Sequence, residues 1–162
     1  MITGPEITEC LAAAGITHVV WVPDSTFGQW DHDLRHSANI RLITVCREGE
    51  AWAVAAGLYL GGAVPLVMIQ CTGLFESGDA LRNVLHDYKL PLLAMIGYRS
   101  YLSEETLPGD TARIFTEPIL KAWNLEYVFV DEPSKKPLIT QHYTECRKHG
   151  KPGIVLLAEG RA

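Results

Sequence analysis

The chain has 162 residues, of which 48% are hydrophobic and 20% are charged, and its formal net charge is −5. This length suits one domain, and the apolar fraction is high enough for a folded core. The negative charge, without a stripe of basic residues, argues against nucleic acid as a partner. The longest apolar runs, such as Ala63–Ile69, are far short of the roughly 20 residues that a membrane span needs. The N-terminus has no basic region followed by an apolar stretch, so we expect a cytoplasmic protein.

Short β-branched or apolar runs alternate with longer helical segments along the whole sequence. In chain order, the pattern predicts helix Pro5–Ala14, strand Thr17–Val22, a helix capped by Ser25 or Thr26 and running to His36, strand Arg41–Val45, helix Arg47–Leu60, strand Pro65–Ile69, helix Leu74–Tyr88, strand Pro91–Ile96, loop Tyr101–Asp110, helix Ala112–Trp123, strand Tyr127–Val130, helix Ser134–His149 and strand Gly153–Leu157. Gly78 is expected to interrupt its helix near the start, and Pro118 to kink its helix or mark a late start. Strands that alternate with helices build a parallel sheet covered on both faces. We therefore expect one domain over residues 1–162, with a three-layer α/β/α fold and a six-stranded, mostly parallel sheet.

Several common sites are missing from the sequence. It contains neither a G-x-G-x-x-G cradle after the first strand, nor a P-loop, nor a G-x-S-x-G nucleophile elbow. The four cysteines have no C-x-x-C spacing, so we expect reduced thiols in or near the core, with Cys71 as an open case. His32 and His36 are four residues apart, but no third metal ligand accompanies them, and no metal site is predicted.

In such a sheet, ligands bind beyond the carboxyl ends of the strands. Four segments that follow predicted strands carry polar or small residues, and they are Val22–Ser25, Cys46–Glu50, Gln70–Gly73 and Gly97–Ser100. Their common position makes them the candidate site.

The helix that begins near Glu48 is rich in Ala and Gly. An acidic residue in a first helical turn is explained by the helix dipole alone. The segment from Arg47 to Leu58 nevertheless resembles the marker helix of pyrimidine-binding domains in thiamine diphosphate enzymes, where a Glu precedes a Gly by nine residues, as Glu48 precedes Gly57. The resemblance implies that Glu48 hydrogen-bonds N1′ of the aminopyrimidine and activates the cofactor. Many members have His or Asn in place of Arg47, and often Ala in place of Glu50.

The flanking loops resemble phosphonopyruvate decarboxylases and the alpha subunit of sulfopyruvate decarboxylase. Val22–Ser25 is similar to their first loop, which implies that Asp24 handles protons during decarboxylation and that Ser25 also faces the substrate. A turn or helix cap is the alternative role for Asp24. Ile96–Ser100 is similar to a further loop, in which Arg99 binds an anionic group of the substrate or forms a surface ion pair.

Ile69–Leu74 resembles the loop that lines the cofactor and substrate site in these enzymes. The resemblance implies that Gln70, Thr72 and Gly73 contact the cofactor, and that Gln70 also binds the substrate. The chain departs from the family at Cys71, Thr72, Phe75 and Glu76, where Asn, Ser, Gly and Asn are usual, and these changes of polarity and charge leave the substrate open.

These enzymes hold Mg²⁺ and the diphosphate with a G-D-G motif, which the chain lacks, since its two Gly-Asp pairs continue to Ala80 and Thr111. We therefore expect a diphosphate-binding beta subunit that holds Mg²⁺, in an α2β2 or larger assembly. The predicted activity is decarboxylation of sulfopyruvate or phosphonopyruvate to CO₂ and an aldehyde. A carboligase of the acetolactate type, a non-catalytic homologue with a regulatory binding role and a flavodoxin-like nucleotide-binding module remain alternatives.

Overall fold

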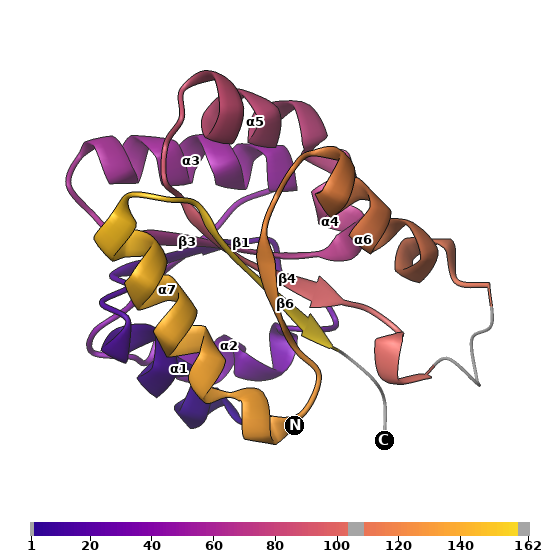
Figure 1. Cartoon of the computed structure of the whole chain (residues 1–162). Coiled ribbons are helices and arrows are strands. Elements are labelled where there is room, and N and C mark those ends of the chain that lie inside the picture. Colours follow the sequence, from indigo (N-terminus) through magenta and orange to yellow (C-terminus); the bar gives the residue numbers. More distant parts are fainter. Residues whose placement is uncertain (1, 104–108, 159–162) are drawn as a thin grey trace.

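A computed structural model describes residues 2–103 and 109–158. Its strands are β1 (His18–Trp21), β2 (Arg41–Thr44), β3 (Pro65–Gln70), β4 (Leu93–Tyr98), β5 (Tyr127–Val130) and β6 (Gly153–Ala158). Its helices are α1 (Gly4–Ala13), α2 (Asp31–Arg35), α3 (Glu48–Leu60), α4 (Cys71–Glu76), α5 (Gly78–Arg82), α6 (Thr111–Ala122) and α7 (Pro137–His149), with short turns of 3₁₀ and π-helix between them (Figure 1).

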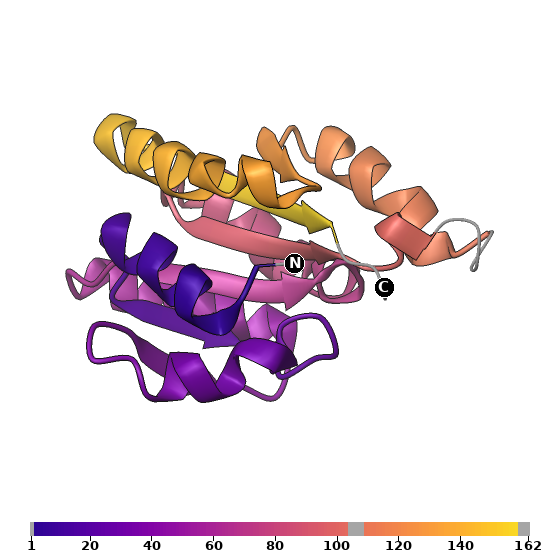
Figure 2. The same cartoon turned by 90° about the horizontal axis from the view of Figure 1, so that it is seen from below.

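All six strands are parallel, and their order in the sheet is β2-β1-β3-β4-β6-β5. Residues of β3, β4 and β6 are almost all buried, because both faces of the sheet are covered by helices. Helices α3 to α6 cover one face and α1, α2 and α7 the other, which Figures 1 and 2 show as three layers. The predicted α/β/α fold is therefore confirmed.

Each face of the sheet has its own apolar core. On one face, Trp52 of α3 is fully buried with residues of β3, β4 and α6. On the other face, Tyr143 of α7 is fully buried, and its hydroxyl donates a 2.7 Å hydrogen bond to the carbonyl of Ala94 in β4. The two cores together hold the sheet rigid, so that the loops at its carboxyl edge start from fixed points.

Some predicted helices begin at other residues in the structure than the sequence pattern indicates. The helix expected from Ser25 or Thr26 begins only with a 3₁₀ turn at Gly28, followed by α2. The segment predicted as a loop at Gln70–Gly73 is already helical from Cys71. The interruption predicted near Gly78 is present, because α4 ends at Glu76 and α5 begins at Gly78. The late helix start considered at Pro118 is wrong, because α6 begins at Thr111 and Pro118 lies inside it.

The helix expected from Ser134 is split in the structure. A 3₁₀ turn covers Pro133–Lys135, and α7 begins at Pro137, whose fixed φ suits a first helical position.

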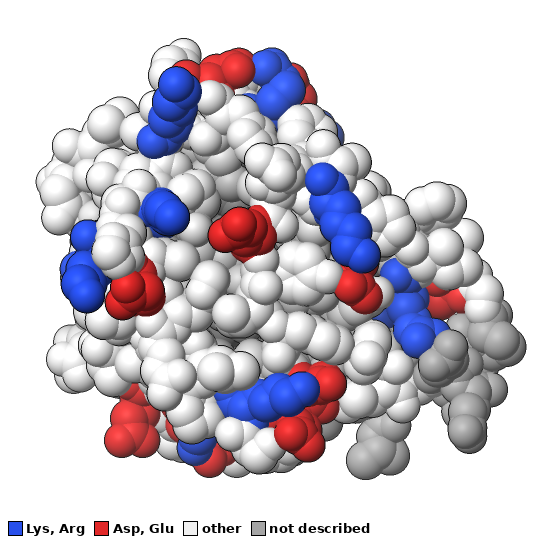
Figure 3. Space-filling model, viewed as in Figure 1, with Lys and Arg blue, Asp and Glu red and all other residues white. Residues whose placement is uncertain are grey.

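In the described part of the chain, no helix combines the length and apolar character that crossing a bilayer requires. Basic and acidic residues are interspersed over the face drawn in Figure 3.

Candidate functional site

The candidate site lies where the central strands end. β1 pairs with β2 and β3, and β3 pairs with β4, so the loops that follow these strands share one edge of the sheet. Asp24 follows β1, Glu48 follows β2, and Gln70 ends β3. The structure thus places the three predicted segments side by side, as expected for a parallel sheet.

Glu48 is the first residue of α3, and its side chain lies against Gly73 in α4. A Cβ atom on residue 73 would come within 2.4 Å of Cγ and 2.8 Å of Oε1 of Glu48. Contacts this short do not occur, so the half-buried Glu48 side chain occupies the space that any larger residue at 73 would take. Among the described residues, none donates a hydrogen bond to the Glu48 carboxylate, and its oxygens are available to a ligand.

Helix α4 also binds the start of α3 through two polar contacts. Oε2 of Glu76 accepts a 2.9 Å hydrogen bond from the Gly49 amide, while Oε1 lies 2.6 Å from Nη2 of Arg47. One turn further along α3, the indole of Trp52 donates a 3.0 Å hydrogen bond to the buried hydroxyl of Ser77. The Gly49 amide holds the pKa of Glu76 below its usual range, with Arg47 as a further cause. Both oxygens of the Glu76 carboxylate therefore bind groups at the start of α3.

Glu50 has a structural role. Its Oε2 accepts a 2.9 Å hydrogen bond from the amide of Cys46, just before α3 begins. A carboxylate at the third position of a helix often accepts a hydrogen bond from the N-cap amide, and Glu50 instead binds the amide one residue before the N-cap Arg47. Of the two acids in the first turn, Glu48 is thus the one that remains available.

Asp24 shapes the loop after β1. Its Oδ1 accepts hydrogen bonds from the amides of Thr26 (2.7 Å) and Phe27 (2.8 Å), which accounts for the turn that delays the next helix. The alternative role foreseen for Asp24, as a turn residue, is therefore present in the structure. The neighbouring Ser25 accepts a 3.3 Å hydrogen bond from Nε2 of Gln70, so two predicted substrate residues from different loops meet.

Gly97 lies in a predicted segment of the site, but the sequence assigned it no role of its own. A Cβ atom at this position in β4 would lie 2.7 Å from the methyl group of Thr26 and 3.2 Å from the ring of Phe27. The loop that carries Asp24 therefore packs directly on the backbone of β4. A glycine within a buried strand was the only signal in the sequence for this close approach.

The structure separates Cys71 from the polar edge. Its side chain is fully buried, facing Thr116 of α6 and the backbone of Arg99, and burial raises the pKa of the thiol. The adjacent Thr72 is exposed. The case left open for Cys71 is thus decided: its thiol belongs to the core.

Arg99 lies beyond the end of β4, about half exposed. Its Nε is 3.7 Å from Oδ2 of Asp110, whose Oδ1 accepts a 3.0 Å hydrogen bond from the Ala112 amide and caps α6. The surface ion pair considered for Arg99 is therefore present.

His32 and His36 stack with ring centroids 4.4 Å apart, and the described residues contain no group of three potential metal ligands.

No protein-family model matches the chain. It is 28% identical over 122 residues, 75% of its length, to a sulfopyruvate decarboxylase of Methanosarcina acetivorans, and 32% identical over 108 residues, 67% of its length, to a phosphonopyruvate decarboxylase of Streptomyces viridochromogenes. It spans only 32% and 27% of these relatives, respectively. A sulfopyruvate decarboxylase subunit alpha of Methanococcus maripaludis is 26% identical over 129 residues, which are 80% of this chain and 77% of that relative.

Among solved structures, a benzoylformate decarboxylase from Polynucleobacter necessarius superposes with a TM-score of 0.74 at 20% identity, over 98% of this chain and 30% of that one. A thiamine diphosphate-dependent 4-hydroxybenzoylformate decarboxylase from Rhodococcus jostii gives a TM-score of 0.65 at 18% identity, over 96% of this chain and 29% of that one. These likenesses identify the fold. The chain is thus a relative of sulfopyruvate and phosphonopyruvate decarboxylases, with the fold of one domain of the thiamine diphosphate-dependent decarboxylases.

Proposed function

We propose that the chain is the pyrimidine-binding subunit of a thiamine diphosphate-dependent 2-oxoacid decarboxylase, in which Glu48 activates the cofactor. The observation that carries the proposal is the position of Glu48, at the carboxyl edge of the sheet with its side chain seated on Gly73. The similarity to sulfopyruvate and phosphonopyruvate decarboxylases supports the reaction class.

The residues present fit the aminopyrimidine end of thiamine diphosphate. When bound, this cofactor supplies a carbon nucleophile for the 2-oxo group and accepts the electrons released as CO₂ leaves. Glu48 would hold a proton shared with a ring nitrogen, and a half-buried carboxyl at a helix start suits that exchange. Thr72 and Gly73, at the start of α4, would line the same end of the cofactor.

The substrate side of the site would be formed by the loops after β1, β3 and β4. Ser25 and Gln70, already joined by a hydrogen bond, offer polar groups to a carboxylate. Asp24 would move a proton there, although its Oδ1 is engaged by the loop backbone. Arg99 would attract an anionic head group such as a sulfonate or phosphonate, in exchange for its 3.7 Å pair with Asp110.

A second chain is part of the proposal. The described residues include no glycine-rich motif that would cradle a diphosphate, which needs amide donors or a cation. The similarity to a subunit alpha over most of both chains suggests that this domain also works with a beta subunit that holds Mg²⁺ and the diphosphate, in an α2β2 or larger assembly. The four unpaired cysteines suit a reducing compartment, and we propose the cytoplasm.

The test is co-expression with the candidate beta subunit from the same operon, followed by measurement of CO₂ release. Sulfopyruvate, phosphonopyruvate and pyruvate are compared with and without thiamine diphosphate and Mg²⁺. We expect that this chain and the beta subunit together (the assembled pair) release CO₂ from one of the anionic substrates only when the cofactor is present. Neither chain by itself should do so. No release from any of them would refute the decarboxylase, and full activity of this chain by itself would refute the need for a partner.

Glu48→Gln in the pair tests the assigned residue, with Glu50→Gln as the matched control. The second variant keeps an oxygen that can accept the hydrogen bond from Cys46, two positions away from Glu48. We expect a loss of at least about a hundredfold in kcat for Glu48→Gln and near-normal activity for Glu50→Gln. Equal activity of both variants would remove Glu48 from the mechanism.

A further inference from the structure

Two residues that depart from the family pattern are bound to each other. Arg47 stands where many members have His or Asn, and Glu76 where Asn is usual. In the structure Oε1 of Glu76 is 2.6 Å from Nη2 and 2.9 Å from Nε of Arg47, although the residues are 29 positions apart in sequence. Both guanidinium nitrogens bind the same carboxylate oxygen, and these charge-assisted hydrogen bonds leave the second oxygen of Glu76 for another donor.

The second oxygen of Glu76 links this pair to the candidate catalytic helix. It accepts a hydrogen bond from the amide of Gly49, the residue after Glu48. Amides in the first turn of a helix have no partner within the helix, and an acceptor there stabilises its start. The Glu76 carboxylate therefore binds the backbone immediately next to Glu48.

The contact is one of three that join α4, or Ser77 directly after it, to the first half of α3. The Glu48 side chain rests on Gly73, the Gly49 amide binds Glu76, and Trp52 binds Ser77. Together these contacts leave the first turn of α3 little freedom to shift or rotate. The orientation of the Glu48 carboxyl depends on that turn.

We propose that Glu76 is a positioning residue for Glu48. With its charge balanced by Arg47, it holds the first turn of α3 against α4 and so fixes the direction in which the Glu48 carboxyl points. The proposal rests on the function proposed above, because it assumes that Glu48 acts on the cofactor. It also assigns the negative charge at position 76 to helix positioning, so that this departure from the family need not report on the substrate.

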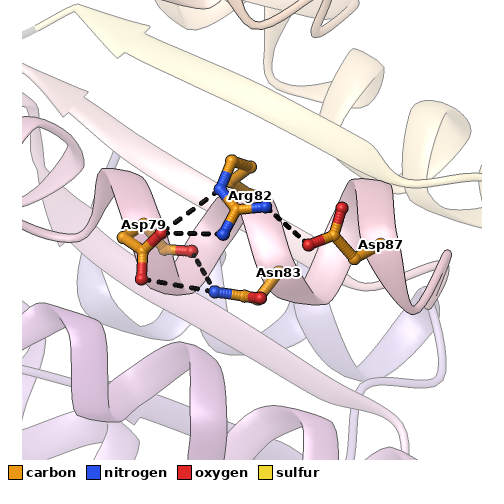
Figure 4. A network of polar contacts seen from close by, with 4 residues as sticks. All are labelled: Asp79, Arg82, Asn83 and Asp87. Atoms are coloured by element: carbon orange, nitrogen blue, oxygen red, sulfur yellow. Dashed lines mark hydrogen bonds and ion pairs between the residues drawn. The ribbon is translucent and has the colours of Figure 1, made fainter.

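The experiment compares Glu76→Ala and Glu76→Asp with a matched ion-pair variant, Arg82→Ala. Arg82 on α5 lies 2.9 Å from Asp79 and 2.5 Å from Asp87. Figure 4 shows these ion pairs, and among the described residues no hydrogen bond or ion pair joins this network to the start of α3. Its loss thus removes a comparable exposed ion pair from a neighbouring helix. Three quantities are measured: kcat and KM of the assembled pair, the thermal midpoint, and hydrogen exchange of the Gly49 amide in the isolated chain.

We expect Glu76→Ala to lower kcat about tenfold through misplacement of Glu48, with substrate KM changed less than about twofold. Gly49 exchange should accelerate in the same variant. Glu76→Asp keeps the charge but is one methylene shorter, so it should lose part of kcat, and it covers the case in which the alanine variant does not fold. Arg82→Ala should leave kcat and Gly49 exchange at the wild-type values.

The proposal is overturned if the Glu76 variants lose thermal stability while kcat stays equal to that of Arg82→Ala, because that is the result of a purely structural ion pair. Unchanged Gly49 exchange in Glu76→Ala would overturn it as well. If the wild-type pair shows no cofactor-dependent activity, the proposed function fails, but Gly49 exchange still reports whether Glu76 holds the turn. If Glu48→Gln is inactive and both Glu76 variants are fully active, only the positioning role fails.

Discussion

The side chain of Glu48 lies directly on the α-carbon of Gly73, in the space where any other residue would place its Cβ. The two residues come from different βα units, yet the backbone of one forms the seat for the carboxylate of the other. A glycine at position 73 is therefore required by a neighbouring side chain, since it makes no turn with positive φ there. This relationship leads to the first prediction.

Gly73→Ala should displace the Glu48 carboxyl. A Cβ only 2.4 Å from Cγ of Glu48 forces that side chain to another rotamer, so we expect CO₂ release by the assembled pair to fall on the order of a hundredfold. The isolated chain should still fold, at a cost of about 1–3 kcal/mol in urea denaturation. Gly78→Ala is the control, because its Cβ would meet Trp123 at an ordinary 3.4 Å. Equal activity of the two variants would contradict the seating of Glu48 on Gly73.

The cysteines should differ in reactivity according to their burial. Cys46 is exposed, whereas Cys71 is fully buried with its thiol pKa raised by that burial. A raised pKa leaves less thiolate at pH 8, and the thiolate is the form that iodoacetamide attacks. Peptide mass spectrometry should therefore find Cys46 alkylated well before Cys71. Equally fast labelling of Cys71 would show that its side chain is open to solvent, against its place in the core.

The sheet could be predicted from the sequence because its strands are buried on both faces and read as continuous apolar runs, as in Leu66–Ile69 and Ile154–Leu157. The positions of Glu48, Asp24 and Gln70 at one edge followed from the parallel order. The early start of α4 at Cys71 was missed because Thr72 and Gly73 are poor helix formers. Tertiary contacts with α3 outweigh that local preference.

The partners of Glu76 could not be predicted from the sequence either, because they too depend on tertiary contacts. Arg47 and Glu76 were each visible as departures from the family, but nothing in one sequence joins residues 29 positions apart. Their contact depends on how α4 crosses the start of α3, which follows from packing around Trp52 and Ser77. The same limit applies to Gly97, whose neighbour Thr26 comes from a loop.

Gly57→Ala should stabilise the isolated chain. Gly57 lies inside α3, is exposed, and has open space around the position of a Cβ. Alanine has the higher helix propensity, so we expect a gain of about 0.5–1 kcal/mol in urea denaturation. A loss of stability would show that other atoms lie close to the Cβ position of residue 57, where the structure has open space. Gel filtration of the assembled pair carrying the variant would then show whether the face around Gly57 is covered by the partner, since a covered face would weaken the assembly.

Glu6 should make stability depend on pH at the junction of α1 and α7. Its Oε1 accepts a 2.8 Å hydrogen bond from Lys136, and its Oε2 accepts one of 2.9 Å from the Thr3 amide; these contacts lower its pKa from 4.5 to about 2. A carboxyl whose pKa is lower in the folded state contributes stability above pH 4.5, and the contribution is lost as the pH falls toward 2. Glu6→Gln should therefore be less stable than the wild type at pH 6.5, and the difference should shrink between pH 4.5 and pH 2. Glu9→Gln, on the same helix without a hydrogen-bond donor among the described residues, controls for the loss of charge. Urea denaturation across this range measures the effect, and a difference that stays constant or grows as the pH falls would show that Lys136 does not hold the ionised form of Glu6.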